Sequence, residues 1–169
     1  RLRTVTGVQT CALPILTAVI AAGLPSCRPT PATPQNVFDR VPDRLITTNR
    51  FVLYLHGRIA EGPDRRPADP NWGVYAYPEI LDALAGGGVT VISQHRAANT
   101  DMDEYAHRAS GQVQRLLQAG IPPAHITVVG FSKGGGIAMR VSALMENANL
   151  NFVFLAACGN GDFSDRSEE

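Results

Sequence analysis

The sequence predicts an α/β fold in which helices flank a parallel sheet. Four short apolar runs are separated by segments with helical periodicity. The runs are continuous rather than alternating, as strands that are buried on both faces require. Strands that alternate with helices in this way form parallel sheets with right-handed crossovers. The expected strands comprise residues 51–55, 89–93, 126–129 and 152–155.

Three segments between or after these strands carry apolar residues on one helical face. The first face comprises Tyr77, Ile80, Leu81 and Leu84. The second comprises Met102, Tyr105, Ala106, Ala109, Val113, Leu116 and Leu117, and the third Ile137, Val141, Leu144 and Met145. Thr100 and Asp103 form a capping-box pattern before the second helix, and Gly120 stands where the C-cap of that helix is expected.

Composition excludes several classes of protein. Hydrophobic residues make up 44% of the 169 residues, which is typical of a chain with a globular core. The 15 basic and 15 acidic residues balance, so the chain lacks the charge pattern of a nucleic-acid-binding protein. The three cysteines have no metal-binding spacing. We therefore expect no nucleic-acid partner and no metal site.

One motif carries most of the functional information. Gly130-Phe131-Ser132-Lys133-Gly134 directly follows the expected strand at 126–129 and leads into the third helix. A serine at a sharp strand-to-helix turn exposes its hydroxyl, and glycines beside it avoid collisions with the adjoining strand and helix. This pattern predicts Ser132 as a nucleophile in an elbow built by Gly130 and Gly134. The alternative is a glycine-rich turn with an ordinary serine.

A second motif ends the first strand as Leu55-His56-Gly57. With the serine motif, it resembles the first half of an α/β-hydrolase, over about residues 50–161. The closest similarity is to small bacterial hydrolases with a Leu-His-Gly strand end and a Gly-x-Ser-Lys-Gly-Gly elbow. The resemblance implies an oxyanion hole formed by the backbone N–H groups of Arg58 and Lys133. It also implies a small acyl substrate, most often an ester, and no cofactor.

The resemblance further implies a later acidic residue and a final histidine, which complete a catalytic triad with the serine. Asp162 and Asp165 are candidates for the acid, but all four histidines precede Ser132. His56 is therefore expected to be structural. Either the chain is part of a longer hydrolase and lacks the C-terminal strands of the fold, or it is a non-catalytic binding protein. In both cases we expect the chain as written to be almost inactive, because nucleophilic attack needs a base.

Both ends of the chain resemble translated DNA-sequencing adapters. Residues 5–15 match one adapter over eleven consecutive residues, and residues 166–169 match the start of the opposite adapter. We therefore expect residues 1–15 and 166–169 to be non-native and to contribute nothing to the fold. On this interpretation the strand at 152–155 is an edge created by truncation, and the chain is marginally stable and prone to aggregate.

Residues 16–27 resemble the end of a signal peptide. Residues 16–24 are apolar and too short to span a bilayer, and Leu24-Pro25-Ser26-Cys27 resembles a bacterial lipobox with Cys27 as the lipidated residue. The alternative is an ordinary secretory signal without lipid. Residues 28–44 are expected to be a Pro-rich linker, and residues 45–165 the partial hydrolase domain. We therefore expect the protein to lie in the bacterial cell envelope, in the periplasm or on a membrane through Cys27.

Three further features have alternative interpretations. Residues 58–77 wall a substrate pocket, form a lid, or are a surface loop with Trp72 packed beneath it. Gln94-His95-Arg96 follows a strand and either faces the same pocket or is solvated or structural. Cys158 is either a buried apolar residue or half of a disulfide. A serine–lysine pair with Lys133 is a weak alternative, because the lysine side chain is expected to point away from the serine hydroxyl.

Overall fold

The structure is a computed structural model, and it describes residues 36–157. The chain divides into two units, residues 1–30 and 31–169, and every described residue belongs to the second. The adapter-like ends, the signal-like segment and its Cys27 therefore lie outside the described residues. So do Cys158 and the two candidate acids, Asp162 and Asp165.

The main sheet has five strands in the order β1-β5-β2-β6-β7, and every neighbouring pair is parallel. The strands are β1 (Val37–Phe38), β2 (Phe51–Leu55), β5 (Thr90–Ile92), β6 (Ile126–Phe131) and β7 (Asn151–Leu155). All four expected strands are present, and β6 pairs with both β2 and β7, as predicted. The register sets Leu55 beside Gly130, so the carboxyl ends of β2 and β6 lie level with each other.

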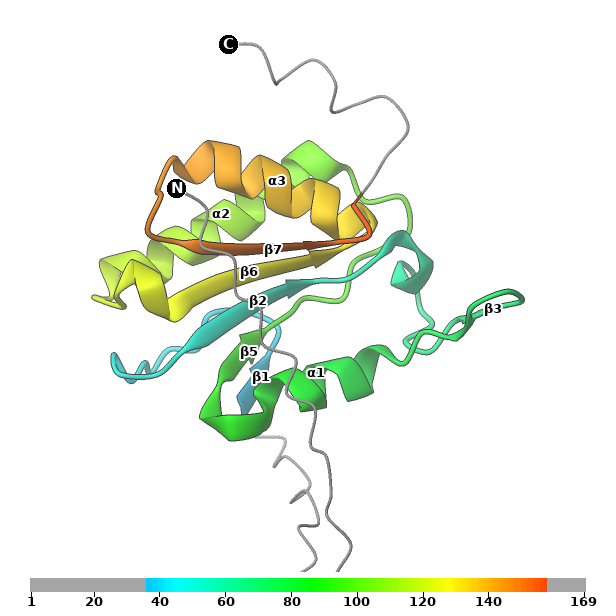
Figure 1. Cartoon of the computed structure of the whole chain (residues 1–169), viewed down its shortest axis with the longest axis horizontal. Coiled ribbons are helices and arrows are strands. Elements are labelled where there is room, and N and C mark those ends of the chain that lie inside the picture. Colours follow the sequence, from blue (N-terminus) through cyan, green and yellow to red (C-terminus); the bar gives the residue numbers. More distant parts are fainter. Residues whose placement is uncertain (1–35, 158–169) are drawn as a thin grey trace, which may run out of the picture. The chain divides into compact units, whose positions relative to one another are not determined.

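Helices cover both faces of this sheet, which confirms the predicted α/β class (Figure 1). One face carries α1 (Tyr77–Ala85), and the other carries α2 (Met102–Gln118) and α3 (Lys133–Met145). Each face has its own core. Tyr77 and Leu81 of α1 pack against Tyr54 and Val91, whereas α2 and α3 belong to the larger cluster that includes Leu53. Among the described residues, no helix has the length and apolar character needed to cross a bilayer.

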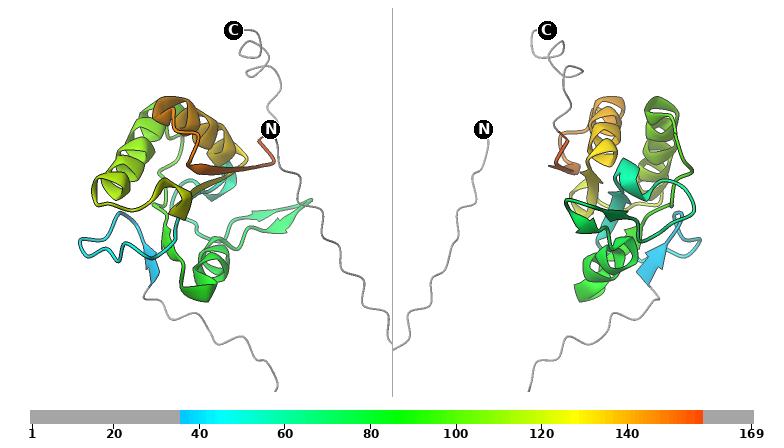
Figure 2. Two further views of the ribbon diagram at one scale, coloured as in Figure 1. Left: turned by 60° about the vertical axis from the view of Figure 1, so that its left-hand side comes forward. Right: turned by 90° about the vertical axis from the view of Figure 1, so that its right-hand side faces the viewer.

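The segment between β2 and α1 contains a small hairpin. After the short 3-10 helix η2 (Arg58–Ala60), strands β3 (Ala68–Asp69) and β4 (Gly73–Val74) pair antiparallel and project away from the main sheet (Figures 1 and 2). Two more 3-10 turns, η3 (Gly86–Gly88) and η4 (Pro123–His125), lead into β5 and β6. The projecting hairpin shows that residues 58–77 are more than a featureless loop.

The sheet begins before residue 45, where the sequence analysis placed the start of the domain. Val37 and Phe38 pair with Val91 and Ile92 of β5, and Val41 is buried in the core. Residues 36–44 are therefore not a free linker, because they cover an edge of the sheet. A two-residue strand is too short to leave a recognisable pattern in a Pro-rich sequence.

Two details of the helices also differ from expectation. The N-cap of α2 is Asp101, whose carboxylate accepts hydrogen bonds from the N–H groups of Asp103 (3.0 Å) and Glu104 (2.8 Å). The expected Thr100–Asp103 capping box is wrong, because the Thr100 hydroxyl donates instead to the carbonyl of Ala97. Leu144 of α3 is 44% exposed rather than buried, because it faces the groove between α2 and α3.

Candidate functional site

Ser132 occupies a strained turn between β6 and α3. Its φ of 52° and ψ of −120° lie in a region that residues with a side chain rarely adopt. Its N–H donates to the carbonyl of Leu155 in β7, and its carbonyl accepts from the N–H groups of Gly135 and Gly136. The neighbouring strand and the first turn of α3 thus hold the serine in this conformation.

The glycines around Ser132 are required by close backbone approaches. A Cβ at Gly130 would lie 2.2 Å from the carbonyl oxygen of Gly134, and a Cβ at Gly134 would lie 1.9 Å from the oxygen of Leu55. Neither gap admits a carbon atom, and both contacts are with backbone that cannot move aside. These two positions are the ones that the sequence analysis assigned to the turn, for the same steric reason.

The loop after β2 lies directly beside this turn. A Cβ at Gly57 would stand 3.5 Å from the Cβ of Ser132 and 2.9 Å from the ring of Phe131. Arg58 begins η2, and Lys133 begins α3. Within residues 36–157, neither of their backbone N–H groups has a hydrogen-bond acceptor. Two N–H donors without an acceptor among the described residues therefore belong to the two segments that meet at Ser132.

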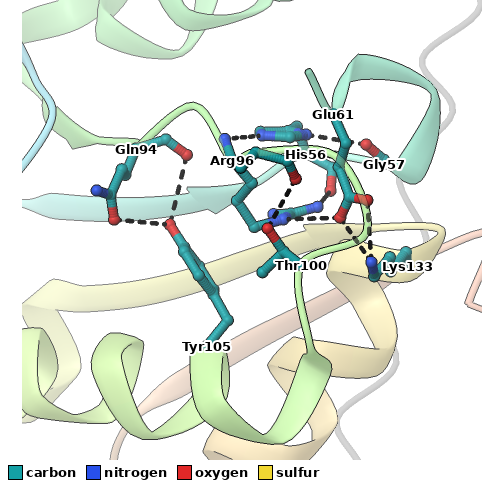
Figure 3. A network of polar contacts seen from close by, with 9 residues as sticks. His56, Gly57, Glu61, Gln94, Arg96, Thr100, Tyr105 and Lys133 are labelled. Atoms are coloured by element: carbon teal, nitrogen blue, oxygen red, sulfur yellow. Dashed lines mark hydrogen bonds and ion pairs between the residues drawn. The ribbon is translucent and has the colours of Figure 1, made fainter.

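A buried carboxylate joins these two segments. Oε1 of Glu61 lies 2.7 Å from Nζ of Lys133 and 3.4 Å from Nε of Arg96, and Oε2 lies 3.0 Å from the same Nζ (Figure 3). The side chains of Glu61 and Arg96 are 3% and 0% exposed. Glu61 thus connects the loop after β2 with α3 and with the loop after β5. Because its ammonium is held by Glu61, Lys133 is poorly suited to act as a base.

His56 belongs to the same buried network and has a structural role, as expected. Its Nδ1 donates to the carbonyl of Gly57 (2.9 Å), and its Nε2 accepts from the N–H of Arg96 (2.9 Å). The Arg96 guanidinium also donates to the His56 carbonyl. Burial and the charge of Arg96 lower the pKa of His56 to about 4, so its imidazole is neutral at pH 7. Arg96 is likewise structural. Of the two interpretations of residues 94–96, the structural one therefore holds for Arg96.

An apolar cavity of about 380 Å³ opens beside Ser132. Tyr75 and Phe131 form one wall, with their rings stacked 5.5 Å apart, and the Tyr75 hydroxyl is fixed by a 2.6 Å hydrogen bond to that of Tyr54. Trp72 also borders the cavity and is 87% exposed, so the alternative in which it packs beneath a surface loop is wrong. The lining residues are Ile59, Asp69, Trp72, Gly73, Val74, Tyr75, Phe131 and Ser132.

No hydrogen bond to the Ser132 hydroxyl is found within residues 36–157. The four histidines all have other surroundings. His56 is in the buried network, and His95 packs its ring against those of His56 and Tyr77. His107 borders the groove between α2 and α3, and His125 lies at the opposite end of β6 from the serine. The described part of the chain also holds no cluster of three metal-ligating side chains.

The glycine-bounded turn at Ser132 was predicted and is present, whereas the roles of Arg58 and Lys133 as oxyanion donors stay a prediction. Glu61 was not predicted. A single glutamate four residues after Gly57 has no pattern that marks it as buried, and only the folded chain brings Lys133 and Arg96 to it. Ile59 and Val74 belong to the segment 58–77 that was a candidate pocket wall, but neither residue was singled out. Their chemistry is ordinary, and their place depends on the hairpin.

Comparison of the chain with protein-family models, with curated proteins and with solved structures found no match.

Proposed function

We propose that the protein is a serine hydrolase that attacks a carbonyl ester through Ser132 and forms an acyl-enzyme. The observation that carries this proposal is the backbone of Ser132, which is strained at φ 52° between a strand and a helix. Strain of this kind costs about 1–3 kcal/mol and concentrates at functional sites. An ordinary serine gains nothing from it, whereas a nucleophile gains an exposed hydroxyl above the sheet. The proposal assigns the chain to the α/β-hydrolase fold.

In the proposed reaction, the Ser132 oxygen bonds to the ester carbon while a base takes the hydroxyl proton. The carbonyl oxygen becomes negative and is stabilised by the N–H groups of Arg58 and Lys133, each worth about 3 kcal/mol. The C–O bond to the alcohol then breaks, and the alcohol leaves with a proton. Water next attacks the acyl-enzyme, which releases the acid and restores the serine.

The competing proposal is a binding protein that has this turn but does not catalyse. It is favoured by one observation, the lack of a hydrogen-bonded base at Ser132 in the described part of the chain. The sequence of a natural form that continues past residue 165 distinguishes the two proposals. The hydrolase requires an acidic residue and then a histidine in that continuation, and the binding protein does not.

The chain as written should hydrolyse an activated aryl ester little faster than its Ser132→Ala variant. An oxyanion hole without a base leaves only a residual acceleration over water. A form with the acid and the histidine should show hydrolysis that disappears in Ser132→Ala. Failure of that form to hydrolyse any ester would overturn the hydrolase. Rapid Ser132-dependent hydrolysis by the present chain would instead indicate an unexpected base, such as Lys133.

A further inference from the structure

The hairpin and its neighbours give the site a distinctive surface. Three of the large apolar side chains that are exposed border the cavity at Ser132, namely Ile59, Trp72 and Val74. They are 37%, 87% and 61% exposed. Exposed apolar residues that gather around a hollow, rather than lie scattered, indicate a binding surface.

The chemistry of the lining selects a neutral apolar group. Asp69 supplies the only charged side chain among the lining residues, and one oxygen of its carboxylate already accepts hydrogen bonds from the N–H groups of Asn71 and Trp72. A carboxylate at the rim repels anions. The rings of Tyr75 and Phe131 stack on each other and form one continuous apolar wall. A cation-binding site would instead need aromatic ring faces that surround the cation.

We propose that this cavity binds the hydrocarbon group of the ester that Ser132 attacks, and that the hairpin determines the length that is accepted. The inference rests on the proposed function, since it takes Ser132 as the reacting atom. A hydrocarbon chain in the cavity would cover Ile59, Val74 and the exposed ring of Trp72. The cavity of about 380 Å³ is partly open to solvent, so the part of a long chain that extends beyond it gains no further contact.

Binding can be measured without catalysis. Trp72 is the only tryptophan of the chain, so its emission reports contact with a ligand at the cavity. The Ser132→Ala variant would be titrated with ethyl esters of straight-chain acids from acetate to decanoate, and with alkyl acetates of equal length. The two series distinguish an acyl chain from an alcohol chain as the bound group.

We expect a saturable blue shift of Trp72 emission in at least one series. The dissociation constant should fall about fourfold for each added CH₂ and become constant once the cavity is filled. A monoester of a dicarboxylic acid of the same length should bind at least tenfold more weakly. A dissociation constant that does not depend on chain length, or a choline ester that binds more tightly than its neutral isostere, would overturn the proposal.

Matched variants locate the effect. Val74→Ser and Ile59→Ser, made in the Ser132→Ala protein, should each weaken binding of the longer esters by about fivefold. Ile46→Ser is the control, because Ile46 is 63% exposed but does not line the cavity, and it should bind as before. Equal effects of all three substitutions would contradict the assignment.

The hydrolase proposal and the cavity proposal are contradicted by different results. In one outcome, esters bind with a dissociation constant that depends on chain length, but the unaltered chain shows no Ser132-dependent hydrolysis in added imidazole. This outcome would support the cavity proposal and contradict the hydrolase proposal. Hydrolysis that depends on Ser132 but proceeds at the same rate for short and long esters would support the hydrolase and overturn the cavity.

Discussion

At the scale of single residues, Ser132 combines a reactive side chain with an unfavourable backbone. Its φ of 52° and ψ of −120° suit glycine better than serine. The hydrogen bond from its N–H to Leu155 and the short approach of α3 to β2 keep this conformation in place. The fold therefore maintains at Ser132 a backbone conformation that lowers stability, and strain of this kind concentrates at functional sites.

Two substitutions at this residue separate the hydroxyl from the strain. Ser132→Ala and Ser132→Gly both remove the hydroxyl, but only glycine relaxes the backbone. We expect Ser132→Gly to be about 1 kcal/mol more stable than Ser132→Ala, after the greater entropy of unfolded glycine is subtracted. Urea unfolding of both variants measures the difference. Equal stabilities would mean that the turn is not strained.

His56 gives the fold a defined response to pH. Its pKa is about 4 in the folded state and 6.5 in the unfolded chain, so between these values the unfolded chain binds more protons. The contribution of His56 to the free energy of unfolding is therefore fully present above pH 6.5. It is lost as the pH drops from about 6.5 to about 4. The difference between the two pKa values of His56 corresponds to roughly 3 kcal/mol in the free energy of unfolding.

The comparison of urea unfolding at pH 7.5 and pH 4.5 tests this response. His56→Gln should lose less stability between the two values than the unaltered chain loses. His107→Gln, at an exposed site on α2, controls for the removal of an imidazole. If His56→Gln loses as much stability as the unaltered chain, other groups cause the pH dependence.

At the scale of elements, Glu61 fixes the loop after β2 to the beginning of α3. Its substitution by Gln would leave the buried Arg96 and the nearly buried Lys133 without an opposite charge. Loss of one partner from a buried ion pair is strongly destabilising, so we expect Glu61→Gln to lower the free energy of unfolding by about 3 kcal/mol.

An exposed pair provides the control for this prediction. Arg66 pairs with Glu79 at the surface, where the two side chains are 60% and 46% exposed. Glu79→Gln should change stability by about 0–1 kcal/mol. Urea unfolding of the two variants measures both effects, and a Glu61→Gln protein as stable as Glu79→Gln would show that Glu61 does not hold the loop.

The elements also show how far sequence reasoning reaches. The strands β2, β5 and β6 and the helices with clear apolar faces were predicted because burial selects those patterns directly. β7 has the same apolar run, although its side chains are largely exposed. The strand β1 was missed because two residues carry no periodicity. The N-cap was placed one residue early, because Thr100 and Asp101 are both good caps and only the backbone decides between them.

The residues of the candidate site also differ in whether the sequence predicts them. Gly130 and Gly134 are predictable because the close backbone approaches at the turn exclude any side chain there. Ser132 was singled out by its place between these glycines. Glu61 and the cavity residues are not predictable, because their roles depend on contacts between segments far apart in the sequence. Trp72 shows the limit best, because the sequence left open whether it packs beneath a loop, and the structure exposes it beside the cavity.

At the scale of the whole molecule, β7 is the feature that affects behaviour in solution. It is an edge strand of the described sheet, and its Val153, Phe154 and Leu155 are 40%, 42% and 46% exposed. Exposed apolar edge strands pair with other chains and promote aggregation. We expect Val153→Lys to raise the fraction of soluble monomer, measured by size-exclusion chromatography with light scattering.

A control separates edge pairing from general hydrophobicity. Ile46→Lys removes a more exposed apolar residue, at 63% exposure, from a loop outside the sheet. It should leave the monomer fraction unchanged. A similar gain from both substitutions would mean that the edge of the sheet has no special part in association.

We propose, centrally, that Ser132 is a nucleophile stabilised by the N–H groups of Arg58 and Lys133, and that no residue within 36–157 serves as its base. Hydrolysis of a para-nitrophenyl ester in increasing imidazole tests it most directly, because imidazole can take the hydroxyl proton in place of a histidine. We expect the rate with the unaltered chain to rise with imidazole above the rate with Ser132→Ala, which reports hydrolysis by imidazole alone. Equal rates for the two proteins at every imidazole concentration would contradict the claim.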